Sequence, residues 1–155
     1  MDKKVLSITP GLASFATPYS SGDVLGAVNT VSSAALNSGQ CDKLDTVLVL
    51  DKANQKAALD LIFFSEAPAN SLGADNAAYA LNDADLATVI GRVSVAAADY
   101  VSSSTTNAEA TLRNIELTLQ PKPGTQTIFM VAVARGAATY GSASDLIIKL
   151  GLEQD

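Results

Sequence analysis

Residues 59–95 read LDLIFFSEAPANSLGADNAAYALNDADLATVIGRVSV, and this stretch decides the fold class. Residues 59–64 place bulky side chains on both faces of a period-two pattern, which predicts a strand that is covered on both sides. Pro68 has no N–H to give to a sheet, so the strand ends before it and a polar excursion follows. Val93 and Val95 resume the alternation. The stretch therefore predicts two strands joined by a long connection.

A short helix is expected within this connection, over Ala84–Ile90. Asp83 is placed to cap it, because a carboxylate there can accept from the free N–H groups of the first turn. Asp85 follows within that turn, and Gly91 suits the position after the last turn. The helix is too short to form a layer, so we expect it to close one end of a pair of sheets.

Short strands are predicted along the whole chain, and no strand–helix alternation typical of a parallel sheet appears. The pattern predicts an all-β fold, a two-sheet antiparallel sandwich that is jelly-roll-like, in preference to a closed barrel. The eight expected strands are Lys4–Thr9, Gly22–Val28, Leu44–Asp51, Ala57–Ser65, Arg92–Ala97, Thr111–Gln120, Thr127–Ala134 and Asp145–Leu152. The expected core includes Leu48, Leu61, Phe63, Leu117, Phe129, Val131 and Ile148.

The 155 residues are expected to form one sandwich domain, residues 22–155, preceded by an extended arm, residues 1–21. Residues 11–21 are rich in turn formers and small side chains, and Phe15 and Tyr19 are the only large anchors among them. Such a segment gains order mainly by lying on a partner.

The composition limits the classes of partner. Charged residues make up 17% of the chain and the net charge is −6. The ten Lys and Arg residues are scattered, so the clustered cations that nucleic-acid binding needs are missing from the pattern. The same acidity disfavours anionic membranes, and no apolar run is long enough to cross a bilayer. We therefore expect neither nucleic acid nor membrane as a partner.

The sequence offers no catalytic constellation. It contains no histidine and one cysteine, Cys41, which excludes Ser-His and Cys-His pairs. Asp75, Asp83 and Asp85 are candidate calcium ligands, but the glycine and distal glutamate of a calcium loop are missing. A sugar-binding platform of tyrosines is a weaker alternative to ordinary packing. Its members would be Tyr79, Tyr100 and Tyr140. We therefore expect no enzyme activity, catalytic residue, cofactor or metal.

Two motif blocks resemble a family of small tailed-phage virion proteins. Residues 19–26, YSSGDVLG, resemble a "Y-x-x-G-D-V-[IL]-G" start, and Asp75–Asp85, after Pro68, resembles a "D-N-A-A-[YW]-x-L-x-D-x-D" block. Residues 90–93, IGRV, are similar to the strand that follows in that family. The resemblance extends from Tyr19 to the C-terminus. It implies a jelly-roll-like capsid decoration, or cement, protein without catalytic residues.

The resemblance implies a function on the outer surface of a phage capsid, reached after synthesis in the host cytoplasm. The expected partners are the major capsid protein and two further copies of the chain in a homotrimer. The residues expected to bind a partner are Phe15, Tyr19, Asp75, Asn76 and Tyr79. The alternative function is a receptor- or carbohydrate-binding module of a phage fibre.

Overall fold

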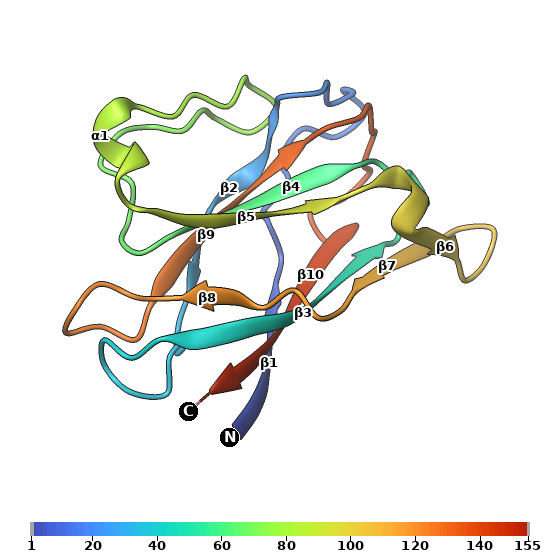
Figure 1. The fold of residues 1–155 in the computed structure, drawn as a ribbon. Coiled ribbons are helices and arrows are strands. Elements are labelled where there is room, and N and C mark those ends of the chain that lie inside the picture. The colour runs from blue at the N-terminus through green and yellow to red at the C-terminus, as the bar shows by residue number, and fades with distance from the viewer. Residues whose placement is uncertain (1, 155) are drawn as a thin grey trace.

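The computed structural model describes residues 2–154, which form two antiparallel sheets packed face to face (Figure 1). The strands are β1 (Asp2–Ile8), β2 (Val24–Val31), β3 (Asp42–Asp51), β4 (Leu59–Phe64), β5 (Val89–Val95), β6 (Tyr100–Ser102), β7 (Ala108–Leu112), β8 (Leu117–Leu119), β9 (Ile128–Ala134) and β10 (Leu146–Gln154). The helices are α1 (Asp83–Leu86) and the 3-10 turn η1 (Ala97–Asp99).

The strand pairing is that of a jelly roll. The larger sheet has the order β1-β10-β3-β7-β6, with β8 also paired to β3, and the smaller sheet has the order β2-β9-β4-β5. Strand β1 thus pairs with β10, β2 with β9, β3 with β7 and β8, and β4 with β5. The chain is one long hairpin rolled so that its successive strand pairs alternate between the two sheets, which confirms the all-β sandwich.

Residues 2–154 form ten strands where eight were expected. Strand β6 lies in a segment interpreted from its Ser and Thr content as a loop, and the single strand expected over 111–120 is divided into β7 and β8. Asn114 and Glu116 both adopt positive φ, which is not strand geometry, so the strand is interrupted between the end of β7 and the start of β8. Each half nevertheless pairs with β3, so the division bends the strand without changing its neighbour.

The helix is shorter than expected and begins one residue earlier. It spans Asp83–Leu86, and its cap is Asn82, whose side chain accepts from the Ala84 N–H at 2.9 Å, so the prediction of Asp83 as the cap is wrong. Val89 already belongs to β5, where it pairs with Phe64 of β4. The tertiary pairing of β5 outweighs the weak local preference for a helix.

The main core lies between the sheets, and a smaller apolar cluster lies on the outer face of the smaller sheet. Leu61, Phe63 and Ile148 are buried in the main core as expected, and Leu117 packs against it while half-buried. Val131 is buried in the outer cluster, against which Phe129 packs half-buried. Leu48 is half-buried, because Val47 and Val49 take the inward positions of β3. The segment between β4 and β5 covers the outer cluster (Figure 1).

The predicted separation of residues 1–21 as an arm is wrong for the residues that the structure describes. Residues 2–8 form β1, which pairs with β10 along its whole length and brings the two ends of the chain together (Figure 1). The rest of the segment runs over the sandwich and buries Leu12 and Tyr19. Met1 of the expected arm and Asp155 of the expected domain lie outside the described residues.

Candidate functional site

The residues expected to bind a partner lie on two segments that the fold joins. Residues 75–79 run beside the start of β2, with the Asn76 N–H donating to the Val24 carbonyl at 2.9 Å and the Tyr79 N–H to the Gly22 carbonyl at 2.8 Å. Asp23 and Ala78 form a further bridge. The two motif blocks, residues 19–26 and 75–85, are distant in sequence but form one structural unit, which we call the motif unit.

The carboxylate of Asp75 is the centre of this unit. Its Oδ1 accepts from the Gly26 N–H at 2.7 Å and the Tyr19 hydroxyl at 2.8 Å. Its Oδ2 accepts from the Ser14 hydroxyl at 2.6 Å and the Ala13 N–H at 3.2 Å. Burial opposes ionisation, but these hydrogen bonds outweigh it and hold the pKa of Asp75 below its usual value. One side chain thus ties residues 13–26 to the connection between β4 and β5.

Gly26 is required where these segments meet. Its φ is +83°, and a Cβ atom there would overlap the carbonyl oxygen of Pro10. That carbonyl accepts from the Ala27 N–H at 3.0 Å, so Pro10 lies directly on the start of β2. The second glycine of the GDVLG motif therefore serves packing and hydrogen bonding within the chain.

Three of the expected partner-binding residues are held inside the molecule to different degrees. Tyr19 is completely buried, and burial, with the neighbouring Asp75 carboxylate, raises the pKa of its hydroxyl, so its predicted role as an anchor on a partner is wrong. Asp75 and Asn76 are half-buried, and Asn76 adopts a positive φ in its turn. Phe15 is 45% exposed beside this unit and is available to a partner.

Tyr79 packs half-buried against the outer apolar cluster of the smaller sheet. Tyr100 and Tyr140 are buried on the other side of that sheet, in the main core, where Tyr140 stacks edge-on against Tyr19. The tyrosines proposed as a sugar platform therefore do not share a surface. Nothing in their arrangement supports that alternative.

Asp85 of α1 holds the first part of the connection between β4 and β5, at Ala69 and Asn70, against the helix. Its carboxylate accepts from the Ala69 N–H at 2.8 Å and from the backbone and side-chain amides of Asn70 at 3.0 and 2.9 Å. These hydrogen bonds, led by the Asn70 side chain, lower the pKa of Asp85. The sequence analysis missed this role, because a residue in the first turn of a helix carries no signal of a partner fifteen residues earlier.

Asp60 is a further buried carboxylate with several partners, and it lies on the outer face of β4. It accepts from the Ser94 hydroxyl at 2.6 Å, from Arg135 Nε at 2.6 Å and from Arg92 Nη1 at 3.1 Å. Burial opposes its charge, but the bonds from Ser94 and Arg135 and the two positive charges outweigh burial and lower the pKa of Asp60. Sequence reasoning had no signal for this cluster beyond a charged residue within an apolar strand.

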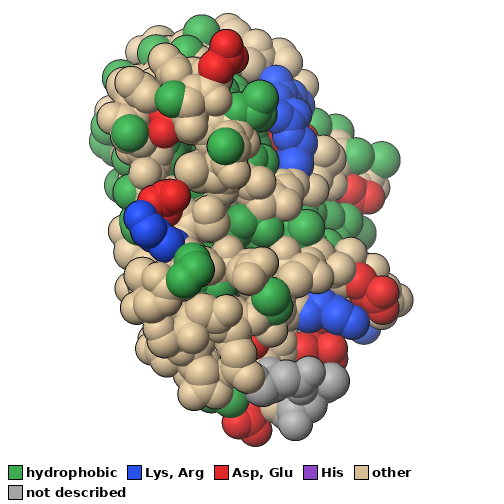
Figure 2. All heavy atoms as spheres, turned by 60° about the vertical axis from the view of Figure 1, so that its left-hand side comes forward, with side chains coloured by type: hydrophobic (Ala, Val, Ile, Leu, Met, Phe, Trp, Pro, Cys, Tyr) green, Lys and Arg blue, Asp and Glu red, His purple; other side chains and the backbone are tan. Residues whose placement is uncertain are grey.

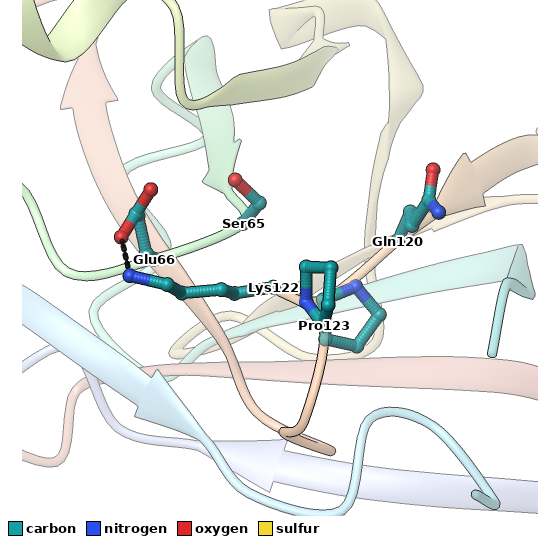
Figure 3. Close-up of a pocket in the computed structure, with 6 residues that line it drawn as sticks. Ser65, Glu66, Gln120, Lys122 and Pro123 are labelled. Carbon is teal, nitrogen blue, oxygen red and sulfur yellow. Dashed lines mark hydrogen bonds and ion pairs between the residues drawn. The ribbon is translucent and has the colours of Figure 1, made fainter. Parts of the chain in front are cut away.

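A shallow hollow lies where the end of β4 approaches the turn between β8 and β9 (Figure 3). Lys122 Nζ lies 2.7 Å from Glu66 Oε2 across it, and the Lys122 N–H donates to the Ser65 carbonyl at 3.1 Å. Gln120 and two prolines complete the lining. The functional groups that line it are an exposed ion pair, an amide and a hydroxyl.

Uncharged side chains dominate the face shown in Figure 2. Charged groups are few on this face and lie scattered over it. Within residues 2–154, no group of three or more His, Cys, Asp or Glu side chains is placed to hold a metal ion. No helix in the same part of the chain is long and apolar enough to cross a membrane.

Comparisons with family models, with curated proteins and with solved structures found no match to this chain.

The carboxylates that accept several hydrogen bonds predict a loss of stability in acid. Asp145 is a further one, and its Oδ2 accepts from the Gly141 and Ser142 N–H groups at 2.8 and 3.0 Å. The pKa values of Asp60, Asp75 and Asp145 are lowered in the folded chain, so their ionised forms stabilise it above the unfolded pKa of about 3.9. As the pH falls through the folded values, this contribution is lost. We expect the free energy of unfolding, measured in urea, to be level from about pH 7 to 5 and to fall below about pH 4. The Asp75→Asn variant should show a shallower fall, and an unchanged stability at pH 3 would contradict this account.

Proposed function

We propose that this chain is a structural virion protein that decorates and stabilises the outer surface of a tailed-phage capsid. The observation that carries the proposal is the motif unit. The blocks at Tyr19–Gly26 and Asp75–Asp85 occur in the order of the family that they resemble, and Asp75 bonds directly to Tyr19 and Gly26. A local structure shared with that family requires its motif residues to contact one another, and in this chain they do.

The fold and the surface agree with such a role. A jelly roll keeps its core constant while the loops at its ends are free to fit a neighbour. With charged residues at 17%, the chain has few groups that are costly to remove from water at an interface. Its net charge of −6 suits the outside of a particle better than contact with packaged DNA.

The proposed partners are the major capsid protein and two further copies of this chain in a homotrimer. Many symmetry-related copies convert a weak single contact into firm attachment, so a small interface is sufficient. Phe15 is the residue of the expected partner-binding set that is most clearly available, and we assign it to the contact with the shell. The proposed role is structural and needs no catalytic residue.

The direct test compares heads made without this protein with the same heads after purified chain is added back. We expect the chain to co-sediment with heads at saturating stoichiometry and to raise the temperature at which they release DNA. Phe15→Ala should lower the affinity for heads by about tenfold while leaving the unfolding free energy unchanged. Val101→Ala is the matched control, because Val101 is also an exposed apolar residue, at 65%, and lies on β6.

Two outcomes would contradict the proposal. One is that heads with and without the chain withstand heat and osmotic shock equally. The other is specific binding on a glycan array with no binding to heads, which would favour the fibre module instead.

A further inference from the structure

Two of the three arginines of this acidic chain converge on one carboxylate. Arg92 of β5 and Arg135, which follows β9, both bond to Oδ2 of Asp60 in the strand between them. The three charged groups sum to +1, while the whole chain carries −6. The cluster is therefore a local positive site on an acidic protein.

The two guanidinium groups have more donors than Asp60 uses. A guanidinium carries five N–H donors, and within residues 2–154 each of these two directs one hydrogen bond to Asp60. The side chain of Asp60 is 8% exposed, whereas those of Arg92 and Arg135 are 48% and 34% exposed. The unused donors are thus open to a ligand from solvent, and Asp60 holds both arginines in position from below.

The hydroxyl of Tyr79 is the third part of the site. Its oxygen is buried, yet it has no hydrogen-bond partner within the described residues. Buried hydroxyl groups are nearly always bonded, so an orphan calls for a missing partner. Tyr79 packs against the outer cluster of the smaller sheet, which includes Ile62 of β4, and Asp60 lies on this same face of β4. Burial raises the pKa of Tyr79, and the positive charges of Arg92 and Arg135 act on it in the opposite sense. A neutral tyrosine hydroxyl in that place is a hydrogen-bond donor.

We propose that Arg92, Arg135 and Tyr79 form a binding site for one carboxylate group, supplied by an acidic side chain of a protein partner. Planar guanidinium groups match the two oxygens of a carboxylate, and the Tyr79 hydroxyl adds a neutral donor. A single carboxylate neutralises the net charge of +1. A phosphate group carries about −1.5 to −2 at pH 7 and would leave an excess negative charge on an already acidic surface. The site stands independently of the proposed capsid role.

The test is an NMR titration of the full chain with sodium acetate, with sodium chloride as the reference at equal ionic strength. We expect saturable shifts of the Arg92 and Arg135 side-chain Nε–H signals with acetate in the millimolar range and not with chloride. A blocked Ala-Glu-Ala tripeptide should bind at least as tightly as acetate, and its Gln counterpart should not bind. These arms distinguish a protein side chain from a free small acid.

Two variants locate the site. Tyr79→Phe keeps the ring and its packing, and Arg92→Gln leaves Asp60 bonded to Arg135 and Ser94. Each should weaken acetate binding by about fivefold or more. Arg113→Gln is the matched control, because Arg113 is an exposed arginine outside the cluster, and it should leave binding unchanged.

Four results would overturn the assignment. Shifts that do not saturate, or that chloride reproduces, mean that there is no site. Binding that survives both variants means that the site lies elsewhere. Tighter binding of inorganic phosphate than of acetate excludes the carboxylate assignment. Binding of acetate without binding of the Glu tripeptide excludes the protein side chain as its source.

Discussion

Replacing Phe63 with alanine should lower the free energy of unfolding by about 3–5 kcal/mol, the largest effect that we expect from a single substitution in this chain. Phe63 is completely buried in the main core, on the face of β4 that meets the larger sheet. Its neighbours in the small sheet, Gly91 and Met130, are fixed by strand pairing and cannot collapse into the cavity. A loss of this size removes a large part of the stability of an ordinary domain.

Urea unfolding followed by far-UV circular dichroism measures this loss. Phe129→Ala is the informative comparison, because Phe129 packs half-buried on the outer cluster and should have a smaller effect. Phe15→Ala, at an exposed position, should change the stability by less than about 0.5 kcal/mol. Equal losses for Phe63→Ala and Phe129→Ala would show that the two apolar clusters are not energetically distinct.

Replacing Asp75 with alanine should lower the free energy of unfolding by about 3 kcal/mol. The substitution removes all four hydrogen bonds to the carboxylate and leaves the buried Tyr19 hydroxyl and the Gly26 N–H without an acceptor. Hydrogen bonds to a charged group contribute more than neutral ones, and a buried donor left unpaired carries its full desolvation penalty. The loss should appear first as increased amide exchange in residues 13–26.

Asp75→Asn separates the charge of this side chain from its shape. The amide keeps one oxygen acceptor and loses the other, so we expect a loss smaller than that of the alanine variant. Asp23→Asn is a matched control, because Asp23 accepts one hydrogen bond, from the Ser20 N–H, in an exposed turn. If Asp75→Ala leaves both stability and amide exchange unchanged, Asp75 does not organise the motif unit.

The motif unit separates structural residues from those that are free to bind. Tyr19, Gly26 and Asp75 have contacts within the chain that account for their identity. Phe15 and the unused donors of Arg92 and Arg135 face solvent, and no contact within the described residues explains why these groups are present. Partner binding should therefore be sought at these exposed groups, and substitutions within the motif unit should act through stability.

The sequence by itself determined the all-β class and the positions of most strands. An alternating apolar pattern is a local property, and burying one face of it is favourable in any sheet that forms. This reasoning placed Leu61 and Phe63 in the core before their neighbours were known. The same reasoning could not assign a sheet face within β3, where apolar residues occupy both faces and Val47 and Val49, rather than Leu48, point inward.

Only the tertiary structure decided which polar residues are internal. Asp75 bonds to groups 49 to 62 residues away, and Asp60 to groups 32 to 75 residues away, so both clusters depend on which strands and loops become neighbours. The same holds for Val89, which joins β5 because β4 lies beside it. A carboxylate and its donors leave no periodic trace in a sequence, because hydrogen bonds are satisfied in space and each pair is set by the packing of the whole sandwich.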